Sequence, residues 1–189
     1  MNDHGEGGDD AKAVSACAAC HGADYRGTVL SYAQADRTLS TEWGTRHFWP
    51  GFRVSCYACH DGPGGEHATR NQPAQVGNAS ASTGAGASVQ VALDAFDVDG
   101  NALELRIVGQ PAHGTAGLTG RTATYIPEAG FSGTDTFTFA AWDGFTDSNL
   151  GVVTVRHLDG GVQPDDGALE GGRVGRDRSR RTGAIFSIL

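Results

Sequence analysis

Two copies of one short motif, Cys-x-x-Cys-His, constrain most strongly what this chain can fold into. They occupy residues 17–21 and 56–60 and contain all four cysteines. Two thiols at this spacing can each form a thioether with one vinyl group of a porphyrin, and the adjoining histidine can bind the iron as its proximal ligand. The pattern therefore predicts two covalently attached haem c groups. The residues concerned are Cys17, Cys20 and His21 at the first site, and Cys56, Cys59 and His60 at the second.

Zinc and disulfide bonds are the two other uses of paired cysteines that must be weighed. Zinc ribbons separate their two cysteine pairs by roughly 15–20 residues, and the gap from Cys20 to Cys56 is much longer. Four thiolates would also complete a tetrahedral zinc shell without a histidine after each pair. Two disulfides would likewise leave both histidines unexplained. Haem is the interpretation that accounts for every residue of the motif.

Charge and hydropathy limit the partners and the location of the chain. The net charge of −8 argues against nucleic acid as a partner. No apolar stretch is long enough for a transmembrane segment. The first residues carry no signal-peptide pattern, although haem is attached covalently outside the cytoplasm. We therefore expect a mature or truncated part of an exported protein, located in the periplasm, on the cell surface or in the medium.

Residues 1–75 are expected to form a dihaem cytochrome c domain. This region is poor in aliphatic runs, and so small a segment can hardly bury a stable core from its own side chains. Two haems would supply the missing apolar mass. The fold class expected for the whole chain is mixed: a small haem-organised domain of loops and short helices, followed by a β-sandwich.

The sixth ligand of each iron must come from another histidine, because the only methionine is Met1. His47 is the first candidate, since it lies within the aromatic stretch 47–52; a surface or core histidine is the alternative. His4 is the second candidate, with a disordered terminal histidine as the alternative. His67, in a glycine-rich loop, is the reserve ligand.

Residues 17–63, from CAACHGADYRGT to CYACHDGP, resemble the haem segments of bacterial extracytoplasmic multihaem cytochromes. The resemblance implies bis-histidine haems that pass electrons between close neighbours. It also favours His4 and His47 as distal ligands, because a histidine–glycine pair upstream of the motif is common in such proteins. This chain carries only two motifs, so conduction over a long distance within one molecule is not implied.

Small and polar residues over 76–87 predict a flexible linker. Beyond it, over residues 88–157, apolar side chains alternate with polar ones or alanine, and turn residues separate the runs. Short alternating strands of this kind predict an antiparallel β-sandwich. The alternating sets are Val89, Val91 and Leu93; Leu103, Leu105 and Ile107; Ala123 and Tyr125; Phe137, Phe139 and Ala141; and Val153 and Val155.

The sandwich region also resembles a known family. The segments DVDGN, QPAHGT and YIPEAGFSGTDTFTF occur in order, and the region is similar to the bacterial cadherin-like, immunoglobulin-like (Ig-like) repeat of surface and secreted proteins. The resemblance implies a spacer or adhesion module, and some members bind calcium.

Calcium is a second candidate cofactor. Asp97, Asp99 and Asn101 present oxygens at alternate positions of one turn, and Asp143 could join them from another loop. Hard oxygen ligands of this kind suit calcium. The alternative is that these side chains only shape the turn by bonding to the nearby backbone, because the closing glutamate of an EF-hand is missing.

The last region, 158–189, has low complexity, with acidic residues first and arginines after them. Such a composition predicts a disordered tail.

Together these features predict an extracytoplasmic dihaem electron carrier whose sandwich serves as a spacer or attachment module, within a multi-subunit haem chain or filament. Its partners would be redox proteins or neighbouring copies of itself. The alternative is a haem enzyme with an open distal site that reduces a small inorganic substrate.

Overall fold

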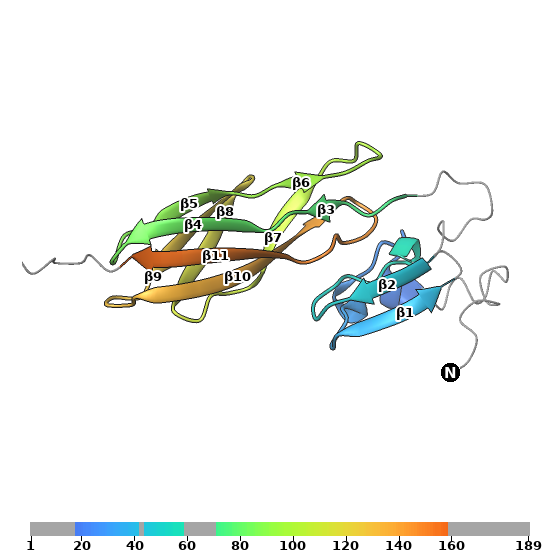
Figure 1. The fold of residues 1–189 in the computed structure, drawn as a ribbon. Helices are drawn as coiled ribbons and strands as arrows, with labels where there is room; N and C mark the ends of the chain where they lie inside the picture. Colours follow the sequence, from blue (N-terminus) through green and yellow to red (C-terminus); the bar gives the residue numbers. More distant parts are fainter. Residues whose placement is uncertain (1–17, 42–43, 59–70, 159–189) are drawn as a thin grey trace, which may run out of the picture.

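The computed structural model describes residues 18–41, 44–58 and 71–158. Of these residues, 49% lie in strands and 8% in helices. Residues 18–41 and 44–58, here called the N-terminal segment, pack at one end of a β-sandwich formed by residues 71–158 (Figure 1). Within the described ranges, no helix is long and apolar enough to cross a membrane.

The N-terminal segment is built around a short β-hairpin. Residues 18–21 are helical. The elements that follow are η1 (Val29–Ser31), β1 (Arg37–Thr41), β2 (Gly44–Phe48) and η2 (Cys56–Ala58). Strands β1 and β2 pair antiparallel. Thr28 caps η1 because its hydroxyl accepts a hydrogen bond from the amide of Leu30.

The expected fold class is wrong for the N-terminal part. A haem-organised domain of loops and short helices was predicted, but the described residues contain a hairpin and belong to a predominantly β structure. The physical reason lies in the source of the apolar core. Phe48, Trp49 and Phe52 are buried with Ala140 of the sandwich, so the segment completes its core with side chains of the neighbouring domain.

The sandwich has two main sheets. One has the strand order β4-β11-β10-β7 and the other the order β5-β9-β8, with a small β3-β6 pair beside them. All neighbouring strands are antiparallel except β4 and β11, which are parallel. The strands are β3 (Gln75–Val76), β4 (Ala79–Gly84), β5 (Val89–Ala92), β6 (Ala95–Phe96), β7 (Glu104–Gly109), β8 (Gly114–Thr119), β9 (Thr122–Pro127), β10 (Gly133–Trp142) and β11 (Gly151–Leu158).

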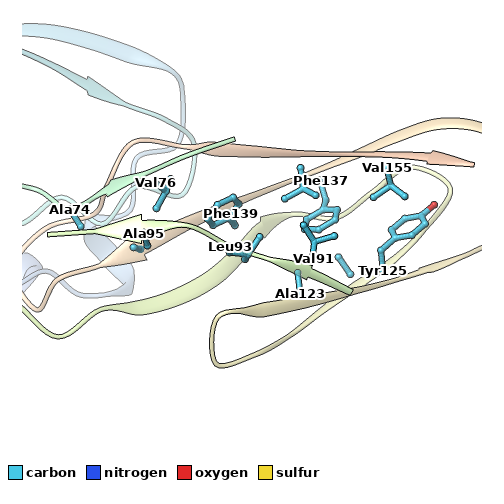
Figure 2. Close-up of a cluster of buried hydrophobic side chains, with 13 residues drawn as sticks. Ala74, Val76, Val91, Leu93, Ala95, Ala123, Tyr125, Phe137, Phe139 and Val155 are labelled. Carbon is cyan, nitrogen blue, oxygen red and sulfur yellow. The ribbon is translucent and has the colours of Figure 1, made fainter. Parts of the chain in front are cut away.

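The core lies between the two sheets (Figure 2). Phe137 and Phe139 of β10 are fully buried, and so are Tyr125 of β9 and Val155 of β11. Alternate residues of a strand point to opposite faces, which is why the period-two sets of the sequence enter this core. Each large apolar side chain buried in this way contributes about 1.5–3 kcal/mol.

The linker expected over 76–87 is largely a strand. Residues 79–84 form β4, which pairs in parallel with β11 from Ala79↔Val153 to Gly84↔Leu158. Ala79 and Ala81 pack against the core. Small residues can form a β-strand where a neighbouring strand supplies hydrogen-bond partners, so the composition of this segment alone did not reveal the strand.

Candidate functional site

His21 of the first motif is held by a hydrogen bond from its ring to the backbone. Its Nδ1 lies 2.9 Å from the backbone oxygen of Val54. Because a carbonyl oxygen can only accept, Nδ1 carries the proton of this hydrogen bond. A hydrogen bond of this kind, from the other ring nitrogen to a carbonyl, is what usually fixes the ring of a metal ligand.

The turn after the first motif depends on Gly27. Its φ is +92°, and a Cβ there would lie 2.8 Å from Cγ of Arg53 and 3.1 Å from the oxygen of Val54. The amide of Gly27 donates to the oxygen of His21 at 2.8 Å. The chain therefore turns back tightly against the stretch that holds the imidazole in place.

The second motif begins beside the first. Cys56 opens η2, and its amide donates to the oxygen of Tyr25 at 3.1 Å. Cys20 is exposed and Cys56 is partly buried. Ser55, just before the motif, donates from its hydroxyl to the oxygen of Phe145 in the sandwich. The described residues of the two motifs thus belong to one compact segment that is anchored on the sandwich.

Several predicted site residues lie outside the described ranges: Cys17, Cys59 and His60 of the two motifs, and the candidate ligands His4 and His67. Most of the expected tail and the start of the first domain also lie outside these ranges.

His47 does not share the apolar surroundings of its neighbours. It lies on β2 next to the buried Phe48, but its side chain is exposed and its Nε2 is bonded to the carboxylate of Asp36. Adjacent strand residues face opposite sides, so the aromatic setting expected from the sequence belongs to Phe48. A role for His47 as a ligand stays a prediction.

The structure connects the candidate calcium residues in one network. Oδ1 of Asp97 accepts from the amides of Asp99 (2.9 Å) and Asn101 (3.0 Å). The side chain of Asn71 joins that of Asn101 (2.8 Å) to Oδ2 of Asp143 (3.0 Å). Oδ2 of Asp97 is buried and has no partner among the described residues. Those residues contain no group of three or more His, Cys, Asp or Glu that could hold a metal ion, so calcium binding also stays a prediction.

A buried ion pair that the sequence analysis missed holds the N-terminal segment on the sandwich. Asp147 is fully buried, and its Oδ2 lies 2.7 Å from a terminal nitrogen of Arg106. The same carboxylate accepts from the amide of Arg53 at 2.6 Å. Arg106 also donates to the oxygen of Gly51 at 3.1 Å and lies over the ring of Trp49.

The charge of Arg106 is favoured by this arrangement. Burial alone would lower the pKa of Arg106, but the hydrogen bond and the negative charge of Asp147 outweigh burial and raise the pKa above its usual value. Aromatic contacts extend the interface: Arg53 lies over the ring of Trp142, and Arg26 over that of Phe145. Because the partners are far apart in the sequence, no local pattern could have revealed them.

Comparisons with known proteins concern mainly the sandwich. Residues 71–156 match the family described as bacterial Ig domain. No curated protein matches the chain. Among solved structures, the endo-fucoidan hydrolase MfFcnA4 of glycoside hydrolase family 107 is similar at 18% identity and a TM-score of 0.38, over 70% of this chain and 23% of the hydrolase. Titin domain M4 is similar at 9% identity and a TM-score of 0.31, over 48% of this chain and 100% of the titin domain.

The family match covers all strands of the sandwich from β3 onward, apart from the end of β11. It also agrees with the Ig-like part of the resemblance seen in the sequence. Residues 71–156 therefore form a bacterial Ig-like domain.

Proposed function

We propose that this chain is an extracytoplasmic c-type cytochrome that transfers electrons through two covalently attached haems, with the Ig-like domain as its platform. Each Cys-x-x-Cys-His motif would hold one haem. A haem iron supplies a one-electron couple, and its axial ligands and its surroundings set the potential.

The observation that carries the proposal is the hydrogen bond from Nδ1 of His21 to the oxygen of Val54. In this tautomer Nε2 would be the atom available to an iron, and His21 follows Cys20 directly in the sequence, as the motif requires. This hydrogen bond supports the proposal of a haem at the first motif.

The protein's own residues have distinct roles in this proposal. The cysteines would form the thioethers that retain the haem, and His21 and His60 would be the proximal ligands. His47 and His4 are the candidates for the distal positions, with His67 in reserve. Covalent attachment of haem takes place outside the cytoplasm, and this supports an extracytoplasmic location.

The Ig-like domain would do more than space the haems from a surface. Its buried Asp147 and the oxygens of Phe145 and Ser148 bind the stretch that leads into the second motif. Such contacts hold the N-terminal segment in one orientation. Redox proteins, or neighbouring copies of the chain, would accept the electrons.

One observation favours a second candidate, a haem enzyme with an open distal site. Nε2 of His47, the atom that would bind iron, is bonded to Asp36. If that bond persists in the haem-loaded protein, one iron would lack its sixth protein ligand and could bind a small inorganic substrate.

Visible spectroscopy of the exported chain, produced in a host that attaches haem c, tests both candidates. The pyridine haemochrome assay should give two haems per chain. Low-spin spectra for both irons support electron transfer, and one high-spin iron that binds carbon monoxide supports the enzyme. A chain without haem would refute both.

A further inference from the structure

Two contacts with the Ig-like domain hold the backbone on either side of Val54. The amide of Arg53 donates to Oδ2 of the fully buried Asp147 at 2.6 Å. The hydroxyl of Ser55, a residue that is 3% exposed, donates to the backbone oxygen of Phe145. Both acceptors belong to the loop between β10 and β11, here called the β10–β11 loop. The residues before and after Val54 are therefore anchored on the same loop of the neighbouring domain.

The β10–β11 loop is itself held by hydrogen bonds. Oδ1 of Asp143, a residue that is 3% exposed, accepts from the amides of Phe145 and Thr146, both at 2.7 Å. The amide of Ser148 donates to the oxygen of Ala141 in β10 at 2.9 Å. Groups fixed in this way by packing and hydrogen bonds can position a functional side chain precisely. The loop is a firm support for the stretch that it binds.

Val54 connects this support to the first motif. Its oxygen accepts the hydrogen bond from Nδ1 of His21 at 2.9 Å, and its amide donates to the oxygen of Ser31 at 3.1 Å. Its side chain packs against the buried cluster that includes Trp49 and Phe52. The carbonyl that orients the ring of His21 thus depends on contacts with the Ig-like domain.

A hydrogen bond to the second nitrogen of a ligating imidazole fixes the ring and raises the basicity of the ligand. A more basic axial ligand favours ferric over ferrous iron, so such a bond lowers the reduction potential of a haem. On the basis of the function proposed above, we propose that the Ig-like domain sets the potential of the first haem, because its β10–β11 loop fixes the carbonyl of Val54 that orients His21. Asp147 and Phe145 act as positioning residues, and neither has to contact the haem.

The potential of the first haem in the full exported chain tests this inference. Redox titration followed by proton NMR reports on each haem through its own strongly shifted resonances, and those of the first haem are the ones that Cys17→Ser with Cys20→Ser removes. Ser55→Ala should loosen the carbonyl of Val54 and raise the potential of the first haem. Ser148→Ala is the matched control and should leave that potential unchanged, because its buried hydroxyl bonds to the backbone within the Ig-like domain, at Ala141 and Asn149.

A second pair of variants removes the other contact at constant net charge. Asp147→Leu with Arg106→Met takes away the acceptor of the Arg53 amide, whereas Asp147→Asn with Arg106→Met keeps an oxygen that can accept. Both double variants lack the buried ion pair, so both lose its contribution to stability. The leucine variant should raise the potential of the first haem and should speed the exchange of the Nδ1 proton of His21 with deuterium oxide. The asparagine variant should change neither.

Two failures would have different meanings. A chain without haem in the haemochrome assay overturns the proposed function. Two haems per chain, with neither test variant differing from its control in the potential of the first haem or in the exchange of the His21 proton, overturns the inference alone. If the leucine variant does not fold, the comparison of Ser55→Ala with Ser148→Ala decides, because each of these changes removes one hydroxyl and no charge.

Discussion

Replacing Arg106 by methionine should destabilise the chain by about 3–5 kcal/mol, the usual cost of leaving one member of a buried ion pair alone. The side chain of Asp147 is fully buried and that of Arg106 is 29% exposed. At an effective dielectric constant of about 20, two charges roughly 4 Å apart attract each other by about 4 kcal/mol. Methionine keeps much of the apolar length that packs on Trp49, so the change mainly removes the charge.

Urea unfolding of four proteins measures this energy: the original chain, Arg106→Met, Asp147→Asn, and the double variant. Asp147→Asn should cost less than Arg106→Met, because the partly exposed guanidinium can turn to water and the Asn oxygen can still accept from the amide of Arg53. The double variant should recover part of the loss, because no unpaired charge remains buried.

A loss below about 1 kcal/mol for Arg106→Met would refute the reasoning, because that is the range of exposed ion pairs. Strictly additive losses in the double variant would also refute it, since they would show that the two charges do not stabilise each other.

Three more predictions concern acid stability, the turn after the first motif, and the candidate ligand His47. Burial would raise the pKa of Asp135, but its hydrogen bonds hold that pKa below the usual value. The carboxylate therefore stabilises the fold above about pH 4, the pKa of Asp in the unfolded chain, and this contribution is lost as the pH falls through the lower pKa of the folded state. In urea unfolding between pH 2 and 6, the free energy of unfolding should fall less with decreasing pH in Asp135→Asn than in the original chain. Equal decreases in the two proteins would contradict this. Gly27→Ala should lower the free energy of unfolding by more than Gly86→Ala, because both glycines have positive φ but only Gly27 has backbone and side-chain atoms in the way; equal losses would refute the steric argument. His47→Ala should turn one haem high-spin and let it bind carbon monoxide when reduced, whereas an unchanged low-spin spectrum would exclude His47 as a ligand.

The features that sequence could predict were local ones. The spacing of the motif predicts haem attachment at Cys20 and Cys56 and iron binding by His21, and this stays a prediction. Period-two alternation located β5, β7, β9, β10 and β11, because one face of each strand enters the core and repeats every second residue.

Strands β1 and β4 were missed because neither has a face of large apolar side chains. In β4, small polar residues alternate with alanine, and its place depends on parallel pairing with β11, a partner distant in the chain. Strand β1 is exposed as far as Ser40, so no apolar face marks it. Whether such a segment forms a strand depends on hydrogen bonds to a partner strand, and the sequence of the segment gives no information about that partner.

The N-terminal core could not be predicted for a related reason. The segment alone lacks apolar mass, and this led to the expectation that haems form its core. In the structure, Trp49 is 1% exposed and donates from Nε1 to the oxygen of Ser148 at 3.1 Å. Contacts between residues so far apart in the sequence arise only from the tertiary fold.

The mass of the denatured, exported chain tests the central claim most directly. Thioethers survive unfolding, so the intact mass should exceed that of the polypeptide by two haems, and Cys17→Ser with Cys20→Ser should reduce the excess to one. A mass equal to that of the polypeptide alone, from a host shown to attach haem c to another protein, would contradict the account.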